Sequence, residues 1–494
     1  MNLARRACLR NHSVTSRSSI SRLGLAWRSL SRSSSVSQEG VKPADEIKDV
    51  NELDRLLELV RDRSDPALRS VMPMRSPQLW VESLRESRSS PASTPDLSGA
   101  TKSTSTLPPR TMSHSYSEFI LPFASDPAVL EQYTNARGGI RTGKLMEDLD
   151  SLAGGVAYKH LMEPGVSRLT GSLSERGFYV VTASVDRLDM LTTLTPSNVK
   201  DLRLSGQVIY TGKSSMEVVV KWEALSQDQT EETIMLGRFT MVCLDAFTNR
   251  PKAVNPLVAL TDDEKTLYKM GEGPCLFYAS GPVVVSEGPM PPVAFKNRRQ
   301  ARGKQSLENS PPTSEEAARL HELYLKYATD KPCSDGIEPV PMGDTLLENT
   351  MQMYPQQRNV QNKVFGGYLM RLAYELGYSN ASVFTRGVLR FLSLDEITFK
   401  HPVPIGSVLR LKSRIAHTIP TASSSVHVIV EASVINDQTG EEKKTNEFRF
   451  TWGSPTRGFN RTVVPKTYKE AMWWLEGSRA LKIGTEIRGI RELA

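Results

Sequence analysis

An internal repeat constrains the fold of this chain more than any other feature of its sequence. The segment NARGGIRTG begins at Asn135 and matches NVQNKVFGG, which begins at Asn359. Asn359 lies 224 positions after Asn135, and Gly367 lies 224 positions after Gly143. A chain of 494 residues with such a repeat is expected to contain two copies of one structural unit.

Each copy is predicted to contain one helix followed by several long strands. The helical pattern follows the glycine turn in both copies, as KLMEDLDSLAGGVAYKH from Lys144 and YLMRLAYELGYSNASVF from Tyr368. Strand patterns rich in β-branched residues follow, LRLSGQVIY and MEVVVKWEA in the first copy and LRLKSRIAH and VHVIVEASV in the second. The predicted fold class is therefore α+β, a duplicated unit in which a long apolar helix packs on an antiparallel sheet.

An acidic residue occupies a core-facing position of the first helix. The stripe at helical spacing consists of Met146, Asp150, Ala153 and Ala157. The second copy has Tyr374 where the first has Asp150, so the two copies differ in chemistry at this position. The neighbouring Glu147 and Asp148 are expected to face solvent.

The net charge of +7 is concentrated near the N-terminus. Residues 1–40 contain seven Arg, no Lys, eleven Ser and one acid, Glu39, so they carry +6 and leave the rest nearly neutral. This composition is typical of a mitochondrial transit peptide and predicts the matrix as destination, although an ordinary basic tail has a similar composition. Without this segment the charge no longer favours nucleic-acid binding.

Several classes of chemistry lack support in the sequence. The four Cys are widely separated and show no metal-binding spacing, so neither disulfides nor a metal site are expected. Gly138–Lys144 has the spacing of a phosphate-binding loop, but Leu145 stands where that motif needs Ser or Thr. The seven His are dispersed, no serine-hydrolase elbow occurs, and no apolar run is long enough to span a membrane.

The remaining candidates are an Asn, a glycine turn and the helix acid. Gly366 and Gly367 at a helix start would let a substrate carbonyl approach backbone N–H groups. Partial burial would raise the pKa of Asp150, so that its carboxylate could deprotonate water. Asn359 could hold that water or the substrate carbonyl. Each residue also has a structural interpretation, since Asn often caps a helix and a buried Asp can be a satisfied structural carboxylate.

Together these motifs resemble a known family. SHSYSEFILPF at Ser113, LMEDLDSLAGG at Leu145, FGGYLMRLAYELGYSNA at Phe365 and NEFRFTW at Asn446 resemble the mitochondrial double-hotdog acyl-coenzyme A thioesterases of the type 9 kind. The resemblance covers about residues 110–480 and implies a tandem hotdog fold, in which an antiparallel sheet wraps a long central helix in each unit.

The resemblance also implies composite active sites that draw residues from both units. The implied catalytic residues are Asp150, Asn359 and Gly367, and the implied substrate-binding residues are Gly366 and Phe365. Asn135, Gly143 and Tyr374 would form a degenerate second site without a carboxylate. Glu375 could supply that carboxylate only after a rotation of the helix, and Asp150 could act as a base or as a nucleophile.

The implied activity is hydrolysis of acyl-CoA to a free fatty acid and coenzyme A, without a metal or cofactor. Acyl-CoA is the expected partner, and a homo-oligomer, by analogy a trimer of the two-unit chain, is expected. A non-catalytic acyl-CoA-binding or assembly module is an alternative. A hotdog hydratase is a further alternative, but it would need a His paired with the acid.

The expected organisation has five parts. They are a transit peptide over 1–40, a mostly disordered segment over 41–109, a hotdog unit over 110–270, a linker over 271–334 and a second hotdog unit over 335–480. Within the second part, the apolar spacing of Val50–Val60 predicts a helix.

Overall fold

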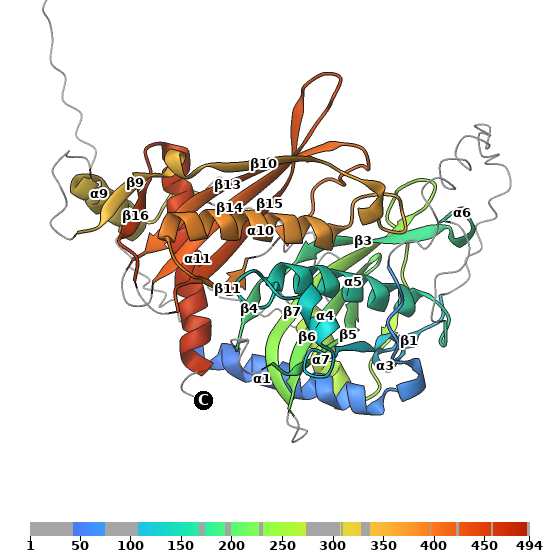
Figure 1. Cartoon of the computed structure of the whole chain (residues 1–494). Coiled ribbons are helices and arrows are strands. Elements are labelled where there is room, and N and C mark those ends of the chain that lie inside the picture. Colours follow the sequence, from blue (N-terminus) through green and yellow to red (C-terminus); the bar gives the residue numbers. More distant parts are fainter. Residues whose placement is uncertain are drawn as a thin grey trace, which may run out of the picture. The chain divides into compact units, whose positions relative to one another are not determined.

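Two long helices, α5 (Thr142–Leu161) and α10 (Gly366–Thr385), lie side by side against a twelve-stranded sheet (Figure 1). The computed structural model describes residues 43–74, 107–166, 173–192, 199–226, 231–272, 307, 310–327, 336–395, 397–420, 424–455 and 458–491. All of them belong to the compact unit Gly40–Ala494. The expected transit peptide, residues 1–40, lies outside the described residues.

The first repeat surrounds α5 with antiparallel strands. Its strands are β2 (Ser117–Leu121), β3 (Phe178–Val185), β4 (Leu188–Met190), β5 (Asp201–Thr211), β6 (Ser215–Leu225) and β7 (Glu231–Asp245). Their order is β4-β7-β6-β5-β2, and β3 also pairs with β7. The inward side chains of these strands, Trp222 among them, pack with the apolar residues of α5 in one core.

The second repeat has the same plan around α10. Its strands are β10 (Leu347–Gln352), β11 (Arg390–Leu394), β12 (Ile397–Thr398), β13 (Val408–Ile419), β14 (Ser425–Ile435) and β15 (Glu442–Gly453), in the order β10-β13-β14-β15-β11. These two helix-and-sheet units confirm the predicted α+β class and the double hotdog fold.

The two sheets join edge to edge into one. Strand β11 pairs with β4 and strand β12 pairs with β3, both antiparallel. The buried Arg187 stabilises this junction because its guanidinium donates to Asp189 of its own repeat and to Ser393 of the other, at 2.7 and 2.9 Å. It also forms an ion pair of 2.9 Å with Asp395.

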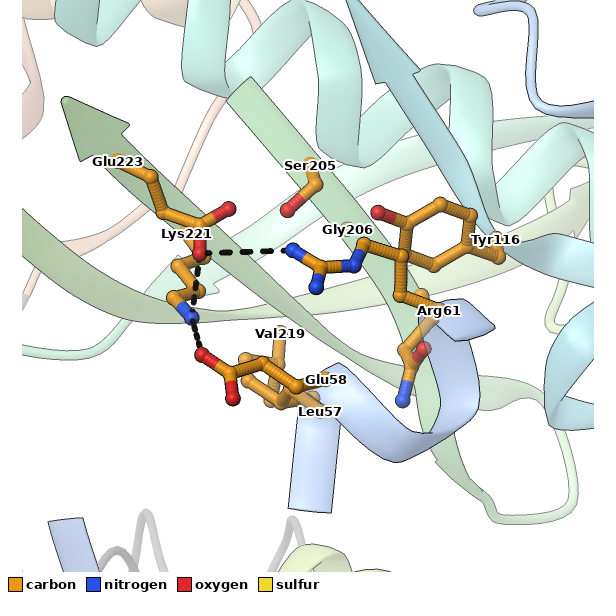
Figure 2. A pocket seen from close by; sticks show the side chains of 10 residues that line it. Leu57, Glu58, Arg61, Tyr116, Ser205, Gly206, Val219, Lys221 and Glu223 are labelled. Carbon is orange, nitrogen blue, oxygen red and sulfur yellow. Dashed lines mark hydrogen bonds and ion pairs between the residues drawn. The ribbon is translucent and has the colours of Figure 1, made fainter. Parts of the chain in front are cut away.

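Helix α1 (Pro43–Arg63) covers the outer face of the first sheet, on the side opposite α5. Glu58 and Arg61 of α1 meet Lys221 and Glu223 of β6 in a charged cluster (Figure 2). The Lys221 Nζ atom lies 2.6 Å from a Glu223 oxygen and 3.3 Å from Glu58 Oε1. Leu56, Leu57 and Val60 are buried on the same helix.

The segment 41–109 is therefore structured where it is described, which corrects the expectation of disorder for residues 43–74. The helix predicted over Val50–Val60 is confirmed within α1. The observed helix is longer than the predicted one, because the apolar spacing is confined to its middle and charged residues flank it. Residues 75–106 of the expected disordered segment lie outside the described residues.

The expected linker also contains a helix, α9 (Ser314–Tyr327). Its Glu316 forms an ion pair of 2.6 Å with Arg479 of α11 (Tyr468–Arg491), and Leu320 packs against an apolar cluster that includes Leu475. Most of residues 271–313 lie outside the described residues. Helix α11 packs on the outer face of the second sheet and continues beyond residue 480.

Short elements complete the described fold. They are η1 (Pro66–Leu68), β1 (Arg110–Thr111), α3 (Met112–Ser115), α4 (Pro127–Gln132), α6 (Leu173–Arg176), β8 (Leu257–Val258), α7 (Asp262–Glu272), β9 (Glu338–Pro341), η5 (Met342–Thr345), η6 (Pro355–Gln357) and β16 (Arg461–Val464). No helix of the described residues is both long and apolar enough to cross a membrane.

Candidate active site

Helices α5 and α10 run antiparallel, and each begins beside the middle of the other. A Cβ atom placed on Gly367 would lie 2.9 Å from the Glu147 Cα atom and 3.0 Å from the Asp150 Cβ atom. At the equivalent contact, a Cβ atom on Gly143 would lie 2.9 Å from the Tyr374 ring. These glycines permit the close approach of the two helices, and the two contacts are related by a pseudo-two-fold axis.

Asp150 is held by hydrogen bonds from both repeats. The Gly367 N–H donates to Asp150 Oδ2 at 2.7 Å, and the Thr182 hydroxyl of β3 donates to Asp150 Oδ1 at 2.8 Å. The residue is only 1% exposed. Burial raises the pKa of Asp150 to about 6. The two hydrogen bonds lower this pKa, but the effect of burial is larger. A carboxylate with this pKa can accept a proton near neutral pH.

A cavity of about 660 Å³ opens beside this carboxylate. Residues of both repeats line it, including Asp150, Asn359, Phe365 and Gly366. The structure therefore brings together the residues predicted for the first composite site. Gly366 lines the cavity, whereas Gly367 contacts the site through the hydrogen bond from its N–H to Asp150.

Asn359 shapes the turn that precedes α10. Its side-chain oxygen accepts hydrogen bonds from the N–H groups of Gln361 and Lys363, at 2.9 and 3.1 Å. Asn135 makes the equivalent bonds before α5, from Arg137 at 2.9 Å and Gly139 at 3.0 Å. Both residues therefore have the structural role that the sequence left open.

The second set of predicted residues also meets at one cavity. Asn135, Gly143 and Tyr374 line a pocket of about 380 Å³. Burial raises the pKa of Tyr374 to about 12, so its phenol stays protonated at neutral pH. Glu375 does not supply a buried acid there, because it forms an ion pair of 2.5 Å with Arg141 at the surface.

Glu147 does not face solvent, which corrects the sequence expectation. It is buried, and its carboxylate lies 2.8 Å from the Arg371 guanidinium of the opposite helix. The helical pattern could not indicate this burial, because α5 is covered by the sheet on one side and by α10 on another. Asp148 is half-buried and accepts a hydrogen bond of 2.7 Å from Tyr133.

Sequence reasoning missed several residues of the first cavity. Thr182 could not be found, because nothing in the strand pattern links it to Asp150. Gln361 lines the cavity, and its side-chain amide donates to the Val180 carbonyl at 2.7 Å. Its counterpart in the first repeat is Arg137, so a comparison of the two repeats could have singled out Gln361. Lys363, Lys400 and His401 are exposed residues of the cavity lining.

The buried His160 serves the fold. His160 lies 2.9 Å from the Asn255 carbonyl, and burial lowers its pKa to about 4. Among the described residues, one acidic group, formed by Glu58, Glu223 and Glu231, has the spacing of metal ligands. Arg61, Lys221 and Arg203 pair with these three carboxylates, so the group is an ion-pair network of three acidic and three basic side chains.

A double hotdog with a buried carboxylate at the interface of its units is an architecture suited to acyl-group chemistry. Comparison with known proteins identifies the family. The chain is 33% identical to mouse acyl-coenzyme A thioesterase 10, mitochondrial, over 387 residues, which are 77% of this chain and 80% of that protein. It is 33% identical to human acyl-coenzyme A thioesterase 9, mitochondrial, over 384 residues, 76% of this chain and 79% of that one. The chain belongs to this family of acyl-coenzyme A thioesterases.

Further comparisons are more distant. Acyl-coenzyme A thioesterase 4, mitochondrial, of Humulus lupulus is 30% identical over 388 residues, 76% of this chain and 67% of that protein. A Staphylococcus aureus acyl-CoA hydrolase solved with butyryl coenzyme A is 19% identical, covers 31% of this chain and 98% of its own, and has a TM-score of 0.28. A putative oleoyl thioesterase of Lactobacillus plantarum is 8% identical over 69% of this chain and 95% of its own, with a TM-score of 0.38. No family model matches the chain.

The pKa of Asp150 predicts how an Asp150→Asn variant changes stability. The folded-state pKa of about 6 exceeds the unfolded value of 3.8, so the folded state binds the proton more tightly and wild-type stability falls as pH rises from about 4 to about 6. Above pH 6, the shift of about 2 units corresponds to a cost of about 3 kcal/mol. Asn removes this cost and should raise the free energy of unfolding by about 1–3 kcal/mol at pH 8.

Urea unfolding at pH 8 and at pH 4 measures this effect. The gain should fade toward pH 4, where the wild-type carboxyl is protonated in the folded state and pH is close to the unfolded-state pKa of 3.8. A variant that is less stable than wild type at both pH values would contradict the assigned cost of burying the ionised carboxylate.

Proposed function

We propose that the chain hydrolyses acyl-CoA thioesters to a free fatty acid and coenzyme A. The observation that supports this most strongly is the contact between Asp150 of one repeat and the start of α10 in the other, at the wall of one cavity. Family membership supports the same reaction, since the relatives are named acyl-coenzyme A thioesterases.

In the proposed mechanism, Asp150 acts as the general base. It takes a proton from water, and the resulting hydroxide adds to the thioester carbonyl carbon to form a tetrahedral oxyanion. The oxyanion collapses, the carbon–sulfur bond breaks, and the coenzyme A thiolate takes the proton from Asp150. Each turnover consumes one water and returns the base to its starting state.

The start of α10 would stabilise the oxyanion. The first N–H groups of a helix lack intrahelical acceptors and carry the positive end of the helix dipole. The Gly367 N–H is used by Asp150, so we assign Gly367 the role of orienting the base, and the carbonyl would approach the N–H of Gly366. Asn359 would position the substrate through the turn that it shapes, and Phe365 would contact the substrate beside Gly366.

Coenzyme A would enter from the exposed side of the cavity. Lys363 and Lys400 are exposed on the lining beside His401, and these two cationic side chains suit the phosphates of coenzyme A. A hydratase is less well supported, because His401 is exposed whereas Asp150 is buried. A non-catalytic binding module is the second candidate, since the pocket around Tyr374 is a similar cavity whose carboxylate, Glu375, lies at the surface and is paired with Arg141.

Release of thiol from a panel of acyl-CoA esters tests the reaction. We expect Asp150→Ala to reduce kcat by about 100-fold or more, the range for loss of a general base, and Asn359→Ala to reduce kcat/KM by about 10-fold. Asn135→Ala is the matched control, because it removes the same turn bonds beside the other pocket; it should retain nearly full activity. Wild-type kcat/KM should rise with pH up to about 6 and then level.

The panel separates the two candidate functions. Binding of coenzyme A esters without turnover of any ester by the wild type would refute hydrolysis and leave the binding module. Equal losses in the Asn359 and Asn135 variants would show that these residues act through the fold.

Charge reversal tests the proposed phosphate contacts. The double variant Lys363→Glu, Lys400→Glu should raise KM for acyl-CoA about 10-fold or more through repulsion of the phosphates, and leave KM for acyl-pantetheine, which lacks the nucleotide, within about 2-fold. Lys213→Glu, an exposed residue of another turn, is the control. A similar rise for both substrates would contradict the assignment.

Import and assembly complete the proposal. We infer that residues 1–40 direct the protein to the mitochondrial matrix, which their Arg-rich composition and the mitochondrial relatives support. A fusion of these residues to a fluorescent protein should enter the matrix, whereas a fusion with all seven Arg changed to Gln should stay outside. We also propose a homo-oligomer, in which another copy contacts the exposed Leu347, the first residue of edge strand β10, and the preceding Leu346. Light scattering would measure the mass of this oligomer.

We propose the domain limits 110–270 and 335–480 for the two hotdog units, with α1 and the end of α11 as additional outer helices.

A further inference from the structure

The segment between α1 and residue 74 lies along helix α5. Lys159, near the end of α5, donates hydrogen bonds to the Leu68 carbonyl and, at 2.7 Å, to the Tyr116 carbonyl. The Glu118 N–H of β2 donates to the Arg69 carbonyl at 2.8 Å. This segment is thus fixed to the first hotdog unit by hydrogen bonds at its start.

Two consecutive glycines of α5 form the surface on which the end of this segment packs. A Cβ atom on Gly155 would lie 2.8 Å from the Met72 carbonyl oxygen, so a side chain there would displace the backbone of the segment. A Cβ atom on Gly154 would lie 3.1 Å from the terminal methyl group of Met74. The Met74 side chain therefore occupies the notch that Gly154 leaves in the helix.

Met74 is also part of the cavity that contains Asp150. It is 5% exposed and lines the cavity together with Gly154 and Met241. Gly154 follows Asp150 by four residues, which places it on the same face of the helix about 6 Å farther along the axis. Met74 thus lies about one helical turn from the carboxylate.

The charges of the cavity indicate the orientation of a ligand. Lys363, Lys400 and His401 are exposed, whereas Met74 and Met241 are buried. A molecule with a phosphorylated head and an apolar tail would keep its head at Lys363 and Lys400 and direct its tail toward the methionines.

We infer that Met74 closes the apolar end of the cavity and thereby limits the length of the acyl chain, an inference that rests on the proposed hydrolysis of acyl-CoA. A chain attached at the carbonyl beside Asp150 and directed along α5 meets the Met74 side chain about one turn later. An unbranched Met can move slightly but still fills the space that additional methylene groups would need. A residue outside both repeats would therefore control substrate choice.

Two variants with opposite expected effects test this role. Met74→Ala removes the obstruction and should shift the maximum of kcat/KM to acyl chains at least two carbons longer, with activity on short chains within about 3-fold of wild type. Gly154→Ala pushes the Met74 methyl group into the cavity and should shift the maximum to shorter chains. Discrimination of about 10-fold per methylene group is typical of a closed apolar pocket.

Met72→Ala is the matched control. Met72 is in the same segment and 1% exposed, but it is not among the residues that line the cavity. It should lower the melting temperature without changing the chain-length profile. Unchanged profiles in Met74→Ala and Gly154→Ala, with both proteins folded by circular dichroism, would overturn the inference.

Binding measurements distinguish this inference from the proposed reaction. In dissociation constants for a series of non-hydrolysable alkyl-CoA thioethers, the preferred chain should become longer for Met74→Ala and shorter for Gly154→Ala. If the wild type hydrolyses no ester but the shift appears in binding, the proposed function fails and the role of Met74 stands. Turnover in the wild type without a shift in either measurement refutes only the role of Met74.

Discussion

The close contact between α5 and α10 is the interaction on which the candidate active site depends. Only a residue without a side chain fits at Gly367, where the Glu147 backbone is within contact distance of a Cβ position. The approach lets the Gly367 N–H bind Asp150, so the positive end of α10 faces a buried carboxylate. Without this hydrogen bond, burial of the charge would cost about 1.5–3 kcal/mol more.

Duplication within one chain allows the two sides of this helix pair to differ. Glu147 and Arg371 are equivalent positions of the repeat, and they face each other near the pseudo-two-fold axis at 2.8 Å. In a symmetric dimer of identical units, each residue would face its own copy, and like charges would meet. The same freedom allows Asp150 in one cavity and Tyr374 in the other.

Helix α1 covers the outer face of the first sheet and precedes the unit over 110–270. Strand β6 therefore carries buried charged residues, Lys221 and Glu223, on one face and apolar residues on the other. The segment that follows α1 reaches the cavity through Met74, so this outer layer also contributes to the candidate active site.

The sequence by itself determined the duplicated α+β fold, the two glycine turns and the difference between Asp150 and Tyr374. These features are local or periodic: a repeat, helical spacing and β-branched runs are visible without knowledge of distant contacts. The family resemblance then paired Asp150 with the distant Asn359 and Gly367, a pairing that local patterns do not contain.

Tertiary structure alone decided which residues surround that acid. Thr182 comes from strand β3, and Met74 comes from the segment after α1. The ion pair of Glu147 with Arg371 joins two helices. No spacing rule in the sequence connects these elements with one another. The raised pKa of Asp150 likewise follows from burial by both repeats. Such properties arise from the packing of residues that are far apart in the chain, and the structure is needed to identify them.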